Sequence, residues 1–310
     1  MTRISLAALC SLTTLLLANS AFAVKSAELY TASSYQYGRF EARLQFAAGD
    51  GVVSSFFLWK DGSERAGTFW NELDFEKLGA ECRLETNAFY GNPAVVHSQR
   101  HTQTALCTEF HTYTYEWTPD YIAWFVDGEE IRRETGAAAT AYAENATAGM
   151  QIRFNIWPGD ASFGGNFSPS ILPIYEHIDW VQYSSYADGA FTVEWRDDFD
   201  DPALASRWLT GSWGSPKNLS THDPLNVTVE DGEAVLALTA DPSGSGGSSS
   251  QGGGSSTGGV VAPPPPTGGG DGCSTAPGRP SGTNTALAAL AAAAMAAFGR
   301  RRSRLLRALP

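Results

Sequence analysis

Short segments in the middle of the chain alternate large apolar residues with polar ones. YGRFEARLQF (37–46) and FHTYTYEWTPDYIAWFVDGEEIRRE (110–134) show this period of two, which is typical of half-buried β-strands. A Thr-Pro-Asp turn and an Asp-Gly turn divide the second segment. Further strands are predicted in VVSSFFLW (52–59), MQIRFNIW (150–157), YEHIDWVQYSS (175–185), FTVEW (191–195) and EAVLALTA (233–240).

Helical periodicity is weak by comparison. The alanine-rich stretch Ala137–Ala148 is the best candidate for a helix, but its pattern is also compatible with a loop. Many short strands separated by turns predict an all-β protein with a β-sandwich architecture.

The two ends of the chain differ in composition from this middle part. Residues 1–23 contain Arg3, an apolar run and the small-residue ending Ala21-Phe22-Ala23, which indicates a secretory signal peptide rather than a buried N-terminal helix. Residues 242–282 are rich in Gly, Ser and Pro and predict a flexible linker with a stiffer proline section. One catalytic domain is therefore expected in residues 24–241.

The last segment, residues 283–310, combines an apolar run with an arginine cluster. The run Ala286–Phe298 is short for a membrane span, which needs about 20 residues. Cys273, this run and Arg300–Arg302 resemble the Myxo-CTERM type of bacterial sorting tail, although an ordinary amphipathic tail is the alternative. The resemblance implies contact with sorting machinery or membrane and a protein that is exported, either secreted or attached to the cell surface.

The charge balance limits the choice of partners. Seven of the 21 bases and one of the 33 acids lie in the end segments, which leaves 14 bases, 32 acids and a net charge of −18 in the domain. Such a surface repels nucleic acid and anionic membranes but is compatible with a neutral polysaccharide. Surplus carboxylates also suit hard cations such as calcium.

The cysteines and histidines add two expectations. Only Cys82 and Cys107 lie within the domain, so an exported protein is expected to join them in a disulfide, with two buried thiols as the alternative. The five histidines form no metal pair and sit in no nucleophile motif: they are His97, His101, His111, His177 and His222.

The stretch WNELDFEKLG (70–79) carries the most informative pattern. On a strand, Trp70, Glu72, Asp74 and Glu76 point to one face, whereas Asn71, Leu73 and Phe75 point to the other. Like charges in one site raise the pKa of at least one carboxyl, which gives glycoside hydrolysis its ionised nucleophile and its protonated acid. A solvated edge strand and a cation site are the alternatives.

The spacing of these two glutamates conflicts with the spacing that catalysis needs. Four residues of flat strand separate their Cα atoms by about 13 Å. A retaining mechanism needs carboxyl groups about 5–5.5 Å apart. We therefore expect a curved sheet on which the two side chains lean together.

Glu72-Leu73-Asp74-Phe75-Glu76 resembles the signature of glycoside hydrolase family 16. Laminarinase-like and agarase-like branches of the family insert one residue before the last Glu, which makes a β-bulge. The absence of that residue here resembles the lichenase and xyloglucan-endotransglycosylase branches, and the flanking segments resemble lichenases over residues 27–240.

This resemblance implies the fold and its chain order. The family fold is a jelly-roll β-sandwich of two curved antiparallel sheets. FDDPALASRW and GEAVLALT stand near the start of most lichenases but follow YEHIDWVQY here, at 199–239. The chain therefore resembles the circularly permuted lichenases, and permutation is tolerated where chain ends lie close together.

The resemblance also implies the site. By position in the motif, Glu72 is the nucleophile, Glu76 the acid/base and Asp74 the helper, and catalysis needs no cofactor. Substrate-binding residues are implied at Phe57, Trp59, Asp61, Glu64, Trp70, Glu85, Asn87, Arg153, Asn155, Trp157, Trp208 and Trp213. Glu85 stands where the family usually has Gln, Asp61 where Asn is usual and Trp59 where Tyr is usual. A structural Ca²⁺ is implied at Asp179, Asp198 and Gly232.

The leading prediction is a monomeric endo-β-1,3-1,4-glucanase, or licheninase. Its substrate would be mixed-linkage β-glucan, cut at β-1,4 bonds that follow a β-1,3-linked glucose. A β-glucan or xyloglucan transglycosylase of the same fold uses the same two glutamates and is the alternative. A glucan-binding module without catalysis is the third hypothesis, which the presence of all three acids disfavours.

Overall fold

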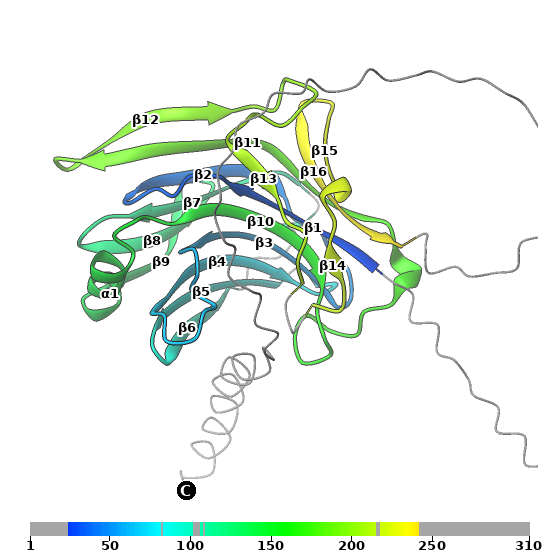
Figure 1. Cartoon of the computed structure of the whole chain (residues 1–310), viewed down its shortest axis with the longest axis horizontal. Coiled ribbons are helices and arrows are strands. Elements are labelled where there is room, and N and C mark those ends of the chain that lie inside the picture. Colours follow the sequence, from blue (N-terminus) through cyan, green and yellow to red (C-terminus); the bar gives the residue numbers. More distant parts are fainter. Residues whose placement is uncertain (1–23, 82, 102–105, 108, 215–217, 242–310) are drawn as a thin grey trace, which may run out of the picture.

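The computed structural model describes residues 24–81, 83–101, 106–107, 109–214 and 218–241, more than half of them in strands (Figure 1). The strands are β1 (Val24–Thr31), β2 (Gly38–Gln45), β3 (Val52–Trp59), β4 (Trp70–Leu78), β5 (Arg83–Gly91), β6 (Ala94–His101), β7 (His111–Trp117), β8 (Tyr121–Val126), β9 (Glu129–Thr135), β10 (Gln151–Pro158), β11 (Ile174–Ala187), β12 (Ala190–Asp197), β13 (Trp208–Thr210), β14 (Thr221–His222), β15 (Val227–Glu230) and β16 (Glu233–Ala240). The helices are α1 (Ala137–Asn145) and the 3₁₀ turns η1 (Pro169–Ile171) and η2 (Pro224–Asn226).

These strands form two curved layers that face each other (Figure 1). One layer has the order β6-β5-β4-β3-β10-β1, and the other has the order β16-β11-β2-β7-β8-β9. Val24 of β1 pairs with Ala240 of β16, which joins the layers at one edge. All described strand pairs are antiparallel except β1 with β14. The predicted all-β, jelly-roll-like sandwich of curved antiparallel sheets is confirmed.

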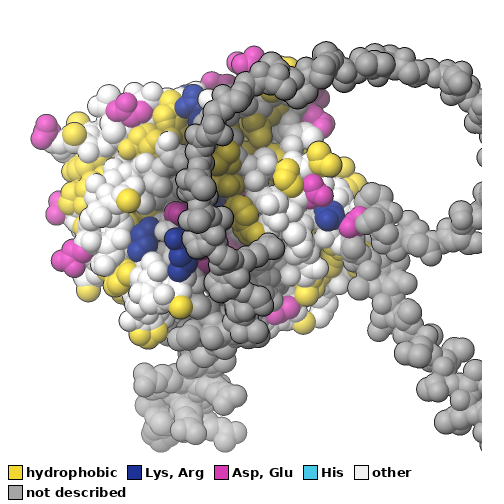
Figure 2. Space-filling view, viewed as in Figure 1, with side chains coloured by type: hydrophobic (Ala, Val, Ile, Leu, Met, Phe, Trp, Pro, Cys, Tyr) yellow, Lys and Arg dark blue, Asp and Glu magenta, His cyan; other side chains and the backbone are white. Residues whose placement is uncertain are grey.

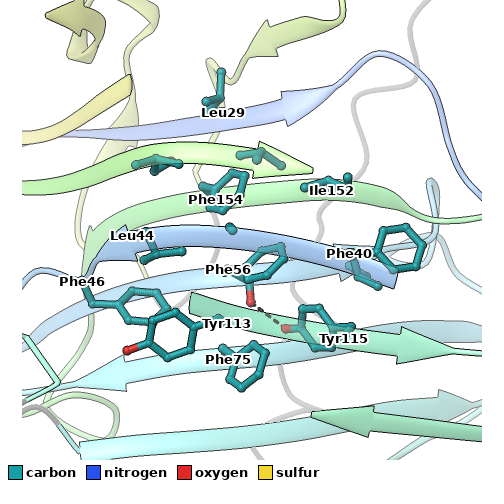
Figure 3. Packing of buried hydrophobic residues seen from close by; sticks show 14 of the residues in the cluster. Leu29, Phe40, Leu44, Phe46, Phe56, Phe75, Tyr113, Tyr115, Ile152 and Phe154 are labelled. Carbon is teal, nitrogen blue, oxygen red and sulfur yellow. Dashed lines mark hydrogen bonds between the residues drawn. The ribbon is translucent and has the colours of Figure 1, made fainter. Parts of the chain in front are cut away.

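The hydrophobic core lies between the layers because alternate side chains of each strand point inward. Phe56 and Phe75 come from one layer, and Tyr113 and Tyr115 come from the other (Figure 3). The ring of Phe56 lies 4.9 Å from the rings of both Tyr115 and Phe154. Such close ring packing fixes the distance between the layers and thus the position of β4.

The alanine-rich stretch is a helix rather than a loop. Helix α1 covers Ala137–Asn145, because alanine has the highest helix propensity and Tyr142 anchors the helix in the core. Its amphipathic signal is weak because the residues around Tyr142 are mostly alanine, which explains why periodicity alone did not predict it. The described residues include no helix whose length and hydropathy would suit a membrane span.

Acidic side chains are visible at several separate places along the margin of the face in view (Figure 2). The predicted signal peptide (1–23), linker (242–282) and tail (283–310) lie outside the described residues, as does Cys82. Export, the fate of the tail and the Cys82–Cys107 bridge therefore stay predictions. Cys107 itself is buried, with 7% of its surface exposed.

Candidate active site

Strand β4 presents its three acids on one face, as its alternation predicts. Leu73 and Phe75 are fully buried in the core. Glu72, Asp74 and Glu76 therefore lie on the opposite face of the layer, which we call the acid face. The register of β4 with β3 and with β5 is continuous from end to end, without a bulge.

Residues that pair directly across neighbouring strands share a face, so the register defines three rows on the acid face. Glu72 lies in a row with Trp59 and Phe89. Asp74 lies in a row with Phe57, Arg153 and Asn87, and Glu76 lies in a row with Ser55, Asn155 and Glu85. The predicted Phe57, Trp59, Trp70, Glu85, Asn87, Arg153, Asn155 and Trp157 all belong to this face.

Glu72 is held by a tryptophan of its own strand. Trp70 Nε1 donates a hydrogen bond to Glu72 Oε2 at 2.7 Å. Burial raises the pKa of Glu72 to about 7, while the Trp70 bond and the positive charge of Arg153 oppose that rise. Trp70 and Arg153 therefore both favour the ionised form of Glu72.

Glu76 keeps its proton more firmly. Burial, followed by the negative charges of Glu85 and Glu72, raises its pKa to about 8, and a hydrogen bond from Asn87 Nδ2 to Glu76 Oε2 (2.8 Å) opposes the rise. The difference between Glu72 and Glu76 is in the direction that a nucleophile and a general acid require.

Asp74 lies between the two glutamates and is 3% exposed. Burial and the charges of both neighbouring glutamates raise its pKa well above the usual range. Asp74 is therefore expected to be protonated while the glutamates share the remaining charge, so it can donate a hydrogen bond to whichever of them is ionised.

Arg153 is the central cation of the acid face. Its Nη1 donates to Glu28 Oε1 at 2.8 Å, and its Nε donates to Gln151 Oε1 at 3.1 Å. The guanidinium carbon lies 4.6 Å from the centre of the Tyr30 ring and 5.7 Å from that of Trp213. These contacts fix a permanent positive charge in the neighbourhood of Glu72.

Aromatic rings surround the acids on this face. Trp59 and Trp70 contact edge to face at 5.4 Å, and Trp157 stacks on Phe163 at 5.6 Å. Such rings can stack on the C–H faces of sugars. Asp61 and Glu64 lie in the connection between β3 and β4, with side chains 68% and 57% exposed, and no contact joins them to the three acids.

Trp208 does not belong to this face, which does not favour the role in substrate binding that the resemblance implies for it. It is 4% exposed and packs in the core, with its ring 5.9 Å from Phe199 and 6.1 Å from Trp195. Its neighbour Leu209 pairs with Tyr30 and therefore takes the acid-face position. Trp213, by contrast, is 41% exposed and lies 5.4 Å from Tyr30.

On the core side of β4, three buried aromatic side chains donate hydrogen bonds to backbone carbonyl groups of the strand. Tyr142 hydroxyl lies 2.6 Å from the carbonyl oxygen of Glu72, and Tyr115 hydroxyl lies 3.1 Å from that of Leu73. Trp124 Nε1 donates to the carbonyl of Asp74 at 3.2 Å. The backbone that carries Glu72 and Asp74 is thus held from behind by helix α1 and by the opposite layer.

Two buried oxygens on the acid face have no hydrogen-bond partner among the described residues. They are Asn87 Oδ1 and Asn155 Oδ1. Each lies in a row with one of the acids of β4. A buried acceptor without a partner destabilises the free protein and favours a ligand that brings a hydroxyl donor.

Several residues of the site were missed from the sequence. Glu28 is 2% exposed, pairs with Asn155 in register and has a pKa raised to about 7 by burial. His222 lies 3.6 Å from Glu28 and accepts or donates a hydrogen bond to Ser26 at 2.9 Å. The available signal was Glu28 itself, the single acid of β1, whose residues are mostly buried; nothing local identified His222.

Two of the residues predicted to hold calcium form ion pairs with arginines. Asp179 Oδ2 lies 2.5 Å from Arg43 Nη1, and Asp198 Oδ1 lies 2.5 Å from Arg196 Nη2. Gly232 lies in the turn between β15 and β16. The described residues contain no group of three or more His, Cys, Asp or Glu side chains arranged to hold a metal. These observations do not test a site that is completed by backbone carbonyl oxygens, and calcium stays a prediction from the sequence.

The known proteins to which this chain is similar include several bacterial β-glucanases. The β-glucanase of Fibrobacter succinogenes is 39% identical over 225 residues, covering 69% of this chain and 63% of the relative. The β-glucanase of Brevibacillus brevis is 32% identical over 163 residues, covering 52% and 60%. A solved structure of Bacillus licheniformis β-glucanase is 26% identical and covers 53% of this chain and 78% of that chain, with a TM-score of 0.42. The chain thus spans less than two thirds of the length of either of the first two relatives.

A family model covers most of the described domain. The model of the glycosyl hydrolases family 16 matches residues 8–196, more than half of the chain and the whole of β4 with its three acids. The chain therefore belongs to glycosyl hydrolases family 16.

Proposed function

We propose that this protein is an endo-β-1,3-1,4-glucanase that hydrolyses mixed-linkage β-glucan with retention of configuration. The observation that carries the proposal is the continuous register of β4, in which Glu72, Asp74 and Glu76 occupy successive positions on one face without a bulge. That spacing is the feature by which the sequence resembles lichenase-type enzymes instead of laminarinase-type ones.

In the first step, the Glu72 carboxylate attacks the anomeric carbon of the glucose on the acid face. A bond forms between this carbon and a Glu72 oxygen, and the bond to the glycosidic oxygen breaks. The proton of Glu76 moves to the departing oxygen, so that the leaving sugar departs as a neutral alcohol. Trp70 and Arg153 favour the ionised form of Glu72, and the charge of Glu85 favours the protonated form of Glu76, which supports this division of roles.

In the second step, water resolves the glycosyl-enzyme. Glu76 is now a carboxylate and takes a proton from the water, whose oxygen bonds to the anomeric carbon as the bond to Glu72 breaks. Two inversions at one carbon give net retention. Asp74, protonated between the two glutamates, hydrogen-bonds to the one that is charged at each stage.

The remaining residues of the acid face would hold the glucan. Trp59, Trp70 and Trp213 offer ring faces for the sugars. Asn87 and Asn155 offer buried acceptors for sugar hydroxyls. Arg153, fixed by Glu28 and Gln151, keeps positive charge near Glu72.

The test is a reducing-sugar assay on lichenan, laminarin, carboxymethylcellulose and xyloglucan. We expect activity chiefly on lichenan, and a loss of at least about 10³-fold in kcat for both Glu72→Gln and Glu76→Gln. Glu130→Gln, an exposed acid on β9 of the other layer, is the matched control and should keep full activity.

Three results would overturn the proposal. Activity chiefly on laminarin would contradict the substrate, and new oligosaccharides longer than the starting material would indicate transglycosylation. An α-configured first product, read by proton NMR at the anomeric position, would contradict retention. Full activity in either glutamate variant would contradict the assigned roles.

We also propose that the chain is circularly permuted relative to most lichenases. Its support is the pairing of Val24 with Ala240, which puts the two ends of the domain side by side. A chain in which a short Gly linker joins these ends and which is opened between Asp200 and Asp201 should fold and keep its activity. An insoluble or inactive product would argue against it.

Export and calcium binding are further proposals that depend on the sequence. Cell fractionation before and after deletion of residues 242–310 tests attachment at the cell surface. Melting curves in calcium and in a chelator test the metal: a fall of several °C in Tm with the chelator would support it, and unchanged melting would exclude a structural role.

A further inference from the structure

Glu76 lies in a row that crosses three strands and ends in a cation. Glu76 of β4 pairs directly with Glu85 of β5, and Glu85 pairs directly with Arg100 of β6. The Glu85 side chain is 10% exposed, and Arg100 Nε donates to Glu85 Oε2 at 2.9 Å. The carboxyl groups of Glu76 and Glu85 are thus direct neighbours across β4 and β5. Of the two, only Glu85 contacts Arg100.

The other neighbours of Glu76 leave Glu85 as the acid directly opposite it. On the other side of β4, the same row continues through Ser55 and Asn155, which carry no charge, and reaches Glu28 on β1. Asn87 of β5 donates its hydrogen bond to Glu76 but does not titrate. The charged and titratable groups around Glu76 are Glu72 and Asp74 of β4, Glu85 of β5, Arg100 of β6, Glu28 of β1 and, in the core behind β4, Tyr115 of β7.

Like charges directly opposite each other in an antiparallel pair repel, and burial increases the effect. The repulsion between the two carboxylates is relieved when one of the two carboxyl groups is protonated. Arg100 contacts Glu85 and not Glu76, so the counterion of this row lies beside Glu85, and the negative charge of Glu85 favours the protonated form of Glu76.

Building on the proposed function, we propose that Glu85, held by Arg100, is a positioning residue that keeps the catalytic proton on Glu76 and extends activity toward higher pH. Glu85 transfers no proton itself. It acts through its charge on the residue opposite, and Arg100 ensures that this charge stays on Glu85.

The titration of Glu76 is consistent with this geometry. After burial, the charge of Glu85 is the largest contribution to the rise in the pKa of Glu76, ahead of the charge of Glu72. Glu85 is therefore expected to affect the proton of Glu76 more strongly than the nucleophile does.

The test is the pH profile of kcat/KM on lichenan for the full chain and for Glu85→Gln. The substitution removes the charge and keeps the shape, so Glu76 should lose its proton more readily. We expect the alkaline limb to move to lower pH by about one unit, which lowers kcat/KM up to about tenfold on that limb. KM at low pH should change little.

Two further variants separate charge from structure. Glu130→Gln makes the same change in a Glu–Arg pair on β9 of the other layer and should leave the limb in place. Arg100→Gln removes the arginine and keeps the acid. It should lower kcat several-fold, because the Glu85 carboxylate beside Glu76 is then no longer held in place, without moving the limb to lower pH.

An unmoved limb in Glu85→Gln, or a change in KM alone, would overturn the inference, because Glu85 would then only contact sugar. A downward shift in Arg100→Gln as large as that of Glu85→Gln would also overturn it. A readout without substrate keeps the two proposals distinguishable: Glu85→Gln should raise Tm more at pH 8 than at pH 5. If that difference appears but no glucan is cleaved, the proposed function fails, whereas the effect of Glu85 on the proton of Glu76 is still shown.

Discussion

Trp70 and Glu72, two residues apart on β4, are joined by a 2.7 Å hydrogen bond from the indole nitrogen to Glu72 Oε2. The bond stabilises the charged form of the carboxyl, and it opposes the effect of burial on the pKa of Glu72. A ring that lies on the acid face thus also acts on the proposed nucleophile.

Removing this hydrogen bond should change the acidic side of the pH profile. Trp70→Phe keeps an aromatic ring but has no donor, so the pKa of Glu72 should rise. We expect the acidic limb of kcat/KM to move to higher pH by about half a unit to one unit, as measured with lichenan. Trp59→Phe, which changes a ring without a bond to Glu72, serves as the control, and an equal shift there would contradict the assignment.

The wild-type profile should be bell-shaped. Below a pH of about 7 the proposed nucleophile Glu72 gains a proton, and above about 8 the proposed acid Glu76 loses one. Activity should therefore be highest between these values. A maximum near pH 5 would show that the carboxyl groups titrate near their ordinary values and that burial is weaker than the structure implies.

Glu76 should also make the domain less stable as pH rises. Its folded pKa of about 8 lies above the unfolded value of 4.5, so its contribution is fully present below pH 4.5 and is lost as pH rises toward 8. Glu76→Gln has no such proton to lose. We expect this inactive variant to exceed the wild type in unfolding free energy by about 1 kcal/mol or more at pH 8, with little difference at pH 4.

Chemical denaturation at the two pH values measures this difference. Glu130→Gln is again the matched control, because Arg133 lowers the pKa of Glu130 and the sign of its effect is opposite. Equal stability of wild type and Glu76→Gln at pH 8 would contradict the prediction.

Trp208 and Trp213 should respond differently to the same substitution. Trp208→Ala removes a core ring and should lower the unfolding free energy by about 3–5 kcal/mol. Trp213→Ala removes a ring that is 41% exposed beside Arg153, so it should raise KM several-fold with a small loss of stability. Thermal melting and lichenan kinetics on both variants test the pair, and the reverse result would restore the sequence-based role of Trp208.

Tyr142 should matter through its hydroxyl group. Tyr142→Phe leaves the carbonyl oxygens of Glu72 and Phe89 without this donor, so we expect a loss of about 1–2 kcal/mol in unfolding free energy. Tyr175→Phe is the matched control, because Tyr175 is 45% exposed and should tolerate the change. An unchanged unfolding free energy in Tyr142→Phe would show that the position of β4 does not depend on this hydrogen bond.

The sequence was sufficient to predict β4, because its alternation has one solution: Leu73 and Phe75 inward, the acids outward. Trp208 could not be placed in the same way. It follows a loop and begins a strand of three residues, so no alternation fixes its face. Only pairing with β1 decides that Leu209, and not Trp208, lies on the acid face.

Glu28 and His222 show a second limit. They lie almost 200 residues apart in the chain and meet because β14 pairs with β1. Their environment depends on a long-range contact that no local pattern contains. The helix α1 shows a third limit, since a run of alanines has high propensity but almost no polar face to reveal its period.

The unpaired oxygens of Asn87 and Asn155 imply how the site would discriminate among ligands. Each buried acceptor left without a donor costs about 1–3 kcal/mol, and this cost is already present in the free protein. A glucan hydroxyl removes the cost, whereas a deoxy or methylated sugar leaves it in place. Selectivity would then depend less on added attraction to the correct sugar than on the two acceptors that an incorrect sugar leaves without a donor.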